Sequence, residues 1–275
     1  EIRLSLVGSE MCIRDRRTPD DLPEVIYARE YDAAISPNGN IPVHAFNLIS
    51  PTFFANSSTG NKYSLWVNVY GVSERYLNVY GEKDLRAQMN QFFHRTYTHP
   101  VDGTTLDMKM LCNWYWYDET AILETGKGTK DWNFYRYAET LLSAAEAIAQ
   151  SSGVNAEAAG YLAQVKARAN MEGKDVSTIA SELQRLGKQA FIEECWKERL
   201  REFPLEMKIW DDCVRTGKFP QISATNKGEV QFVDLIGATN GSGAKFKETD
   251  LYWPIPVNEI QRNPNLTQNE GYSAK

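Results

Sequence analysis

The helical character of this chain is set by the stretch Asp131-Trp-Asn-Phe-Tyr-Arg-Tyr-Ala-Glu-Thr-Leu-Leu-Ser-Ala-Ala-Glu-Ala147. From Asp131 onward the sequence predicts a helix, and its apolar positions recur at spacings of three and four residues. These positions are Tyr137, Leu141, Ala144, Ala145, Ile148 and Ala149. Gly153 is expected to end this helix, because glycine is the residue that most readily adopts the left-handed backbone of a helix C-terminus.

Charged residues of the same stretch also follow helical spacing. Arg136 and Glu139 are three residues apart and Glu146 lies seven further on, so the three are expected to share one helical face. An arginine–glutamate network between neighbouring helices explains this pattern. A carboxylate pair for acid–base catalysis is the weaker interpretation, because nothing in the sequence sets two carboxylates across an open cleft.

Three further helices are expected downstream. Asn155 can cap the second, and Ser177 can cap the third, which is expected to bend at Gly187 and to continue beyond it. The fourth is expected over residues 205–216, ending at Gly217. Four helices with short links indicate two stacked antiparallel pairs like those of tetratricopeptide arrays, although the repeat signature of about 34 residues is absent.

A run of acidic residues marks the end of the predicted third helix. Glu194, Glu198 and Glu202 recur every four residues, and a stripe of like charges is unfavourable by itself. The interleaved cations expected to neutralise it are Lys197, Arg199 and Arg201. The stripe indicates an ion network, either solvated or between helices, because a metal site here would lack histidine.

The chain ends in an extended segment, Leu251-Tyr-Trp-Pro-Ile-Pro-Val-Asn-Glu-Ile260, followed by Asn263-Pro-Asn-Leu-Thr-Gln-Asn-Glu-Gly-Tyr272. Pro254 and Pro256 fix φ and favour an extended backbone, whereas Asn269 and Gly271 indicate a turn. This C-terminal strap is expected to lie over a body already built, with Trp253, Ile255 and Tyr272 covering the helices. Residues 223–249 before it are predicted to form a long surface connection.

The region upstream of Asp131 is mixed in character. A short helix is predicted over Glu82–Phe93 from apolar residues three to four apart, and Lys62–Tyr70 reads as a strand or a loop.

Composition limits the possible functions. The net charge of -6 argues against a nucleic-acid surface. Four scattered cysteines and three histidines show no metal-ligand spacing, so we expect no metal and no cofactor. No apolar run of about eighteen residues is present that could span a membrane.

Three stretches together resemble the SusD/RagB family, nutrient-binding lipoproteins of Bacteroidetes outer membranes. They are the Arg-Tyr-Ala-Glu phrase near residue 136, the charged stretch over residues 198–217, and the strap with its Trp253-Pro254. The residues of the charged stretch that match are Glu198, Arg199, Glu202, Glu206, Asp212 and Arg215. The departures are Met207, Ile209 and Cys213, where the family usually has Gly, Arg and Leu.

The resemblance implies a mainly α fold of tetratricopeptide-like helix pairs, with long irregular loops and an extended C-terminal strap, and incomplete relative to the family. We expect one SusD-like C-terminal domain over residues 20–275, divided into ligand-facing loops (20–130), helical pairs (131–217), and the loop with the strap (218–275). Residues 1–19 are expected to be non-native or disordered, because Ser5 to Arg16 resemble translated sequencing-adapter read-through. The natural protein would then extend further at its N-terminus, including its export signal and lipid anchor.

By the same resemblance the protein is expected at the cell surface, in the outer membrane, where it binds a glycan or similar nutrient and delivers it to a SusC-like TonB-dependent transporter. It is not expected to be an enzyme. The loop aromatics that could stack on sugar rings are Tyr31, Phe53, Phe54, Trp66 and Trp116. The alternatives are an intracellular helical-repeat scaffold, a glycosidase, and a truncated fragment without function.

Overall fold

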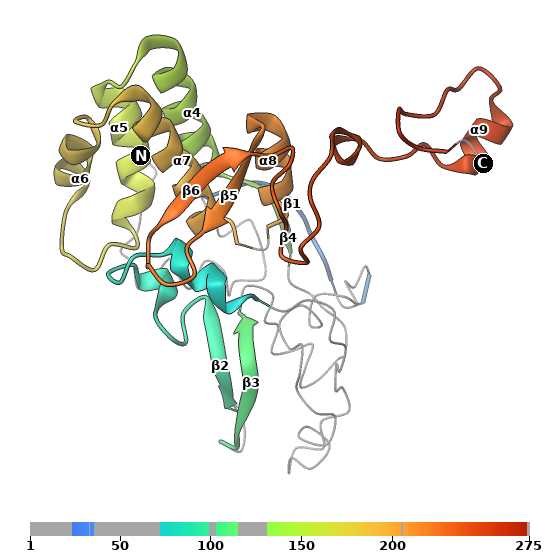
Figure 1. Ribbon diagram of the computed structural model, residues 1–275. Helices are drawn as coiled ribbons and strands as arrows, with labels where there is room; N and C mark the ends of the chain where they lie inside the picture. The colour runs from blue at the N-terminus through green and yellow to red at the C-terminus, as the bar shows by residue number, and fades with distance from the viewer. Residues whose placement is uncertain are drawn as a thin grey trace. The chain divides into compact units, whose positions relative to one another are not determined.

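The computed structural model describes residues 24–32, 34–35, 72–98, 103–114, 131–204 and 206–273 (Figure 1). Two compact units divide the chain. The helical unit comprises Glu1–Glu206 with Ile222–Glu229, and the C-terminal unit comprises Met207–Gln221 with Val230–Lys275. Residues 1–19, the segment Lys62–Tyr70, and Phe53, Phe54, Trp66 and Trp116 lie outside the described residues. The single-domain assignment of residues 20–275 stays a prediction.

Four helices build the core of the helical unit: α4 (Tyr137–Ser152), α5 (Ala156–Ala167), α6 (Val176–Leu183) and α7 (Lys188–Glu202). Helix α4 packs against both α5 and α7, and α5 packs against α6 (Figure 1). Leu142, Ala145, Ala159, Leu162 and Phe191 are fully buried between them. Because alanines occupy much of this interface, the helices can approach closely around a few large side chains. The prediction of a mainly helical scaffold is confirmed.

Helix boundaries agree with the sequence in some places and not in others. The side chain of Asn155 accepts a hydrogen bond from the Ala158 N–H at 2.9 Å, so it caps α5 as predicted. Ser177 does not cap α6, because Asp175 accepts the Thr178 N–H at 2.8 Å and is the N-cap. The predicted bend at Gly187 is a full break, since this glycine is the N-cap of α7.

The stretch before α4 is a strand and not a helix. Residues Trp132–Arg136 form β4, which pairs antiparallel with β1 (Val25–Arg29). Arg136 has an extended backbone, with φ -120° and ψ 154°, and α4 begins only at the next residue. Therefore Arg136 does not share a helical face with Glu139 and Glu146, and that prediction is wrong. Aromatic residues favour strands, and here a partner strand distant in sequence overrides the helical spacing.

The helix predicted over Glu82–Phe93 is also absent. This region contains only the short 3-10 helix η3 (Leu85–Ala87). A second 3-10 helix, η2 (Glu74–Val79), precedes it, and a hairpin of β2 (Phe93–Thr98) and β3 (Thr105–Asn113) follows it. The Leu85 N–H donates to the carbonyl of Ala169 at 2.8 Å, and Asn90 has a left-handed φ of 61°. The backbone therefore bonds to the segment just after α5 instead of continuing as a helix.

The C-terminal unit begins with α8 (Ile209–Thr216), which ends at Gly217 as predicted, with a left-handed φ of 65°. It does not start at residue 205, because Met207 has a φ of 60° that interrupts a helix. The predicted connection over residues 223–249 contains a strand: β6 (Val230–Asp234) pairs with β5 (Lys218–Ile222). The rings of Trp210 and Phe219 both contact Phe246, at centroid distances of 5.6 and 5.2 Å.

The C-terminal strap folds onto itself. It contains η5 (Glu248–Leu251) and α9 (Val257–Arg262). The amide of Gln268 both accepts from and donates to the backbone of Ile255 at 2.8 Å. The Tyr272 hydroxyl lies 2.9 Å from the carbonyl oxygens of both Thr249 and Tyr252, which share its one hydrogen. Trp253 is 84% exposed, whereas Ile255 and Tyr272 are half-buried. That these residues cover the helices stays a prediction.

Candidate functional site

Three exposed aromatic rings gather on the β1–β4 strand pair, and we call Tyr27, Phe134 and Tyr135 the aromatic platform. Tyr27 is 59% exposed, Phe134 40% and Tyr135 54%. The Tyr27 ring stacks on Phe134 with centroids 5.4 Å apart and an interplanar angle of 28°, and on Tyr135 at 6.5 Å and 29°. Large rings left this exposed on a short strand pair are unusual in a monomer surface and point to a binding role.

The platform depends on an irregular strand register. Consecutive residues of a regular strand point to opposite faces, so Phe134 and Tyr135 would not both reach one partner ring. The register of β1 with β4 shifts on both sides of Tyr27, between Val25 and Tyr27 and between Tyr27 and Ala28. Such irregularities bend and twist a strand locally, and here they allow one tyrosine to contact two successive rings.

Tyr31 is the one predicted sugar-stacking residue that the structure describes. It follows β1, and its backbone N–H donates to the Asp131 carboxylate at 2.8 Å. The guanidinium of Arg29 lies 5.1 Å from the centre of the Tyr31 ring, within cation–π range. The Tyr31 ring is half-buried, so part of it is accessible beside the strand pair that carries the aromatic platform.

Sequence reasoning missed all three platform residues. The helix predicted from Asp131 onward includes Phe134 and Tyr135, and the sequence predicts no site role for Tyr27. The available signal was the aromatic run Trp132–Tyr135 directly after Asp131, which has high strand propensity.

A buried ion cluster adjoins the Glu24–Arg136 end of the strand pair. It is formed by Glu24, Arg86, Arg136, Arg168, Glu198, Glu202 and Glu206. Arg136 is at its centre, with 5% exposure. Its guanidinium donates to both carboxylate oxygens of Glu206, at 3.0 and 2.7 Å, to Glu24 at 2.6 Å and to Glu202 at 3.0 Å. A fifth bond reaches the Glu202 carbonyl at 3.1 Å.

The protonation states of the cluster follow from these contacts. Burial opposes charge on Arg136, but Glu206, Glu24 and Glu202 outweigh it and raise the pKa of Arg136 well above its ordinary value. Burial alone would raise the pKa of Glu24, yet Arg136 and Arg168 reverse the direction and lower the pKa. Both pKa directions favour the charged forms of Arg136 and Glu24.

Glu202 joins the two halves of the cluster. It accepts from Arg86 at 3.0 Å, and Arg168 pairs with it at 2.9 Å, beside the bond from Arg136. Glu198, 1% exposed, pairs with Arg86 at 2.8 Å and with Arg201 at 3.1 Å. The acidic stripe of α7 therefore forms an ion network with other secondary-structure elements. Of the two arrangements expected from the sequence, solvated or between helices, the second is the nearer one.

The cations that neutralise this stripe are mostly not those expected from the sequence. They come from other segments, namely Arg86, Arg136, Arg168 and Lys166, joined by Arg201 of α7 itself. Arg199 faces another helix, where it donates to Glu139 at 3.1 Å.

The remaining motif residues have separate surroundings. Glu146 is 3% exposed and accepts from Gln150 at 2.9 Å. Asp212 and Arg215 form an ion pair at 3.1 Å on α8. The turn near Asn269 holds the strap, since the Asn269 amide donates to the Trp253 carbonyl at 2.7 Å.

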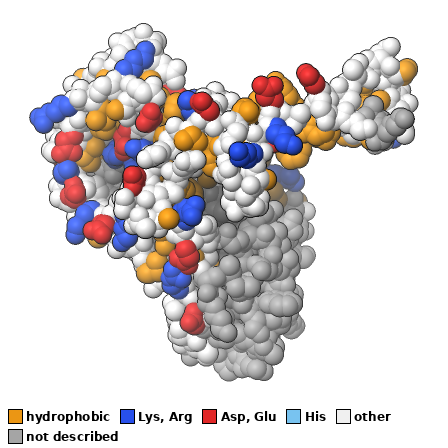
Figure 2. Space-filling model, viewed as in Figure 1, with side chains coloured by type: hydrophobic (Ala, Val, Ile, Leu, Met, Phe, Trp, Pro, Cys, Tyr) orange, Lys and Arg blue, Asp and Glu red, His pale blue; other side chains and the backbone are white. Residues whose placement is uncertain are grey.

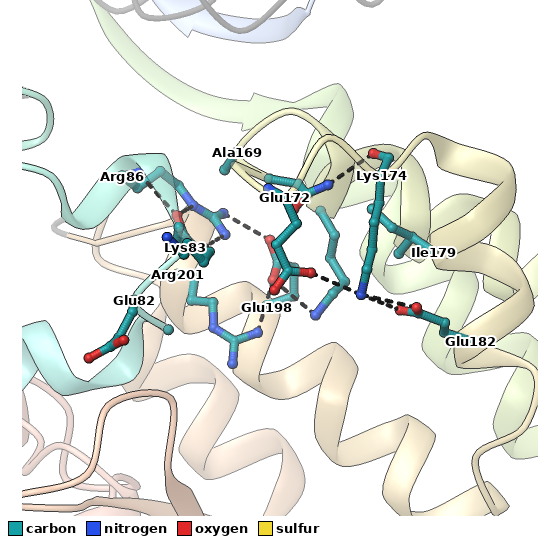
Figure 3. Close-up of a pocket in the computed structure, with 14 residues that line it drawn as sticks. Glu82, Lys83, Arg86, Ala169, Glu172, Lys174, Ile179, Glu182, Glu198 and Arg201 are labelled. Carbon is teal, nitrogen blue, oxygen red and sulfur yellow. Dashed lines mark hydrogen bonds and ion pairs between the residues drawn. The ribbon is translucent and has the colours of Figure 1, made fainter.

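A polar pocket of about 460 Å³ lies in the helical unit between the Gly81–Arg86 segment and helices α5, α6 and α7 (Figure 3). Its floor is formed by Glu198 with Arg86 and Arg201, and its rim carries Lys174, paired with Glu172 at 2.9 Å and Glu182 at 3.0 Å. Among the residues that the structure describes, those lining this pocket are mostly charged or polar and include no aromatic ring.

The surface charge and the residue types of the described chain bear on which other functions are possible. Lysine and arginine side chains are interspersed with acidic ones over the face of the helical unit shown in Figure 2. Within the described ranges, no helix has the length and apolar character needed to cross a membrane. The same residues contain no group of three or more histidine, cysteine, aspartate or glutamate side chains suited to hold a metal ion.

Comparison with known proteins agrees with this architecture. The family model described as "SusD family" matches residues 55–272, well over half of the chain. The starch-binding protein SusD of Bacteroides thetaiotaomicron is 36% identical over 138 residues, which cover 50% of this chain and 21% of that protein.

Solved structures show the same fold. A SusD superfamily protein from Parabacteroides distasonis is 27% identical, with a TM-score of 0.75 over 93% of this chain and 51% of that one. Surface glycan-binding protein A from Bacteroides thetaiotaomicron, in complex with laminarihexaose, is 18% identical, with a TM-score of 0.64 over 98% of this chain and 56% of that one. The chain thus spans about half the length of these solved relatives. The matched family model, supported by the shared helical fold, shows that this chain belongs to the SusD family.

Proposed function

We propose that this chain binds a glycan through the aromatic platform and delivers it, as part of a surface lipoprotein, to a SusC-like TonB-dependent transporter of the outer membrane. The observation that carries the proposal is the stacked arrangement of Tyr27, Phe134 and Tyr135, three rings exposed by 40–59% on one strand pair. The apolar face of a sugar ring packs well on such rings, while its hydroxyls need polar partners nearby.

Polar residues flank the platform along both strands. Arg29 and Glu30 follow Tyr27 on and after β1, and Asn133 stands opposite Ala28. Their amide, guanidinium and carboxylate groups are of the kind that bind sugar hydroxyls. The predicted contacts of Tyr31, Phe53, Phe54, Trp66 and Trp116 with the glycan belong to this proposal.

Two relatives support a glycan as the ligand. One is a starch-binding protein, and the other was solved with laminarihexaose, an oligosaccharide. Family membership also distinguishes this proposal from the intracellular helical-repeat scaffold. We propose no catalytic role for any residue.

The binding test compares three variants by isothermal titration calorimetry against a panel of starch-derived and β-glucan oligosaccharides. Tyr27→Ala and Tyr135→Ala should each weaken binding about tenfold, the equivalent of ~1.4 kcal/mol for one lost stacking surface. Tyr252→Ala is the matched control, because Tyr252 is 62% exposed but belongs to the C-terminal unit. Unchanged affinity in both platform variants would exclude the platform as the binding surface.

The delivery step is tested with the full-length gene in its natural host. The protein should fractionate with the outer membrane and co-purify with a TonB-dependent transporter. Recovery in the cytosol would contradict the transport role.

A further inference from the structure

The aromatic platform is held at one end by an ion pair. Glu24 immediately precedes the first residue of β1, and Arg136 is the last residue of β4, directly after Tyr135. Their side chains meet at 2.6 Å, and the Tyr137 N–H donates to the Glu24 carbonyl at 2.7 Å. At the other end, the Tyr31 N–H donates to Asp131 at 2.8 Å. The strand pair is thus clamped at both ends.

The clamp at Arg136 is the stronger one, because it also fixes the strands to a helix. The fork of Arg136 engages Glu202, the last residue of α7, and Glu206 just beyond it. The guanidinium also lies 5.0 Å from the centre of the Phe203 ring. Five donors in a rigid plane fix both the position and the orientation of the backbone that carries them.

We propose that Arg136 is a positioning residue for ligand binding: it holds the end of β4 so that Tyr135 and Tyr27 keep the stacked spacing that a sugar face requires. This inference rests on the proposed function, since the platform is its binding surface. The irregular register around Tyr27 has no regular ladder to hold it, so an external anchor sets the ring positions. Rings that are already in place lose less freedom when a ligand binds.

Lysine is the informative substitution at this position. Its ammonium keeps the positive charge and carries three donors, but it lacks the planar fork that binds Glu206 through both oxygens. Arg136→Lys therefore keeps the charge balance of the buried ion cluster while loosening the orientation of β4.

Arg201 provides a matched control. It is also a buried arginine, 8% exposed against 5% for Arg136, and it belongs to the same ion network. It bonds to Glu194 at 2.9 Å, to Glu198 at 3.1 Å and to the Val79 carbonyl at 3.0 Å, none of which lies on β1 or β4. Arg201→Lys should therefore cost stability without moving the platform.

The first experiment measures the glycan affinity of Arg136→Lys and Arg201→Lys well below their melting temperatures. Arg136→Lys should weaken glycan binding about tenfold. Arg201→Lys should weaken it by less than about twofold, although both variants should lose a similar amount of melting temperature. Equal affinities for the two variants, or affinity that follows melting temperature in both, would show that Arg136 is only structural.

A second readout is independent of any glycan. Fluorotyrosine is incorporated into the protein, and the fluorine NMR signals of Tyr27 and Tyr135 are assigned with Tyr→Phe variants at each position. Arg136→Lys should shift or broaden both signals, whereas Arg201→Lys should leave them unchanged. If no glycan binds to the unaltered protein, the proposed function fails, yet these signals still decide the positioning role. Unmoved signals in Arg136→Lys would overturn it.

Discussion

Glu202→Gln is expected to destabilise the helical unit severely although it replaces one oxygen with a nitrogen. Glu202 is the carboxylate that three arginines share: Arg86 at 3.0 Å, Arg136 at 3.0 Å and Arg168 at 2.9 Å. Its side chain is 6% exposed, so water cannot reach the arginines to replace the carboxylate oxygen as a hydrogen-bond acceptor. Glutamine also places an amide donor against a guanidinium donor in either orientation of the side chain.

The expected loss follows from the cost of breaking a buried ion pair. Glu202→Gln weakens three buried ion pairs at once and sets an amide donor against a guanidinium, so we expect a loss of about 3–5 kcal/mol even though each arginine keeps another carboxylate. Since a domain's total stability is about 5–15 kcal/mol, this is a large fraction of it. The matched control is Glu172→Gln, whose pair with Lys174 has the similar length of 2.9 Å but is 47% exposed on the glutamate side. That variant should lose less than about 1 kcal/mol.

Urea unfolding followed by far-UV circular dichroism measures both variants against the unaltered protein. The prediction requires a much lower unfolding midpoint for Glu202→Gln than for Glu172→Gln. A loss below about 1 kcal/mol in Glu202→Gln would refute the reasoning, because it would mean that the buried ion cluster adapts readily to a missing charge.

Two further predictions concern the strap and the response to acid. Gly271→Ala should loosen the strap by about 2 kcal/mol, because the new Cβ would lie 2.1 Å from the Thr249 Cγ2 and the backbone has a φ of +84°; hydrogen–deuterium exchange over residues 249–272 measures this. Burial would raise the pKa of Glu194, but Lys166 and Arg201 lower it to about 2 from 4.5, so its stabilising effect is complete above pH 4.5 and is lost as pH falls toward 2. Unfolding midpoints of the unaltered protein and Glu194→Gln across this range test the second prediction.

Each of these two predictions has a defined failure. Exchange rates for Gly271→Ala equal to those of the unaltered protein would show that the strap does not depend on its glycine. An acid response in Glu194→Gln identical to that of the unaltered protein would place the titrating groups elsewhere.

Local patterns in the sequence predicted the helices well where packing partners lie nearby. The apolar spacing after Tyr137 placed α4, and Asn155 and Gly217 marked a helix start and a helix end. The strand β4 was missed because its partner β1 lies more than a hundred residues earlier, and helical spacing in a short stretch does not reveal such a partner. The strand propensity of its aromatic residues was the better guide.

The candidate site was harder to predict from the sequence, again because it depends on contacts between residues far apart in the chain. The platform requires a register irregularity around Tyr27 that no local pattern encodes. The sequence predicts the acidic stripe of α7 and, as its counter-ions, the cations next to it in the chain. In the structure Arg86, Arg136 and Arg168 supply most of the positive charge, and they reach α7 only through the tertiary fold.

The long-range origin of the buried ion cluster has a kinetic consequence. Its ion pairs join residues separated by 34 to 144 positions along the chain. Such contacts form only after β1, the η3 segment, α5 and α7 have come together, so they belong to the last stages of folding. Interactions absent from the folding transition state act mainly by slowing unfolding. The cluster should therefore lengthen the lifetime of the folded helical unit, and so its resistance to proteases that cut transiently opened chains, more than it speeds folding.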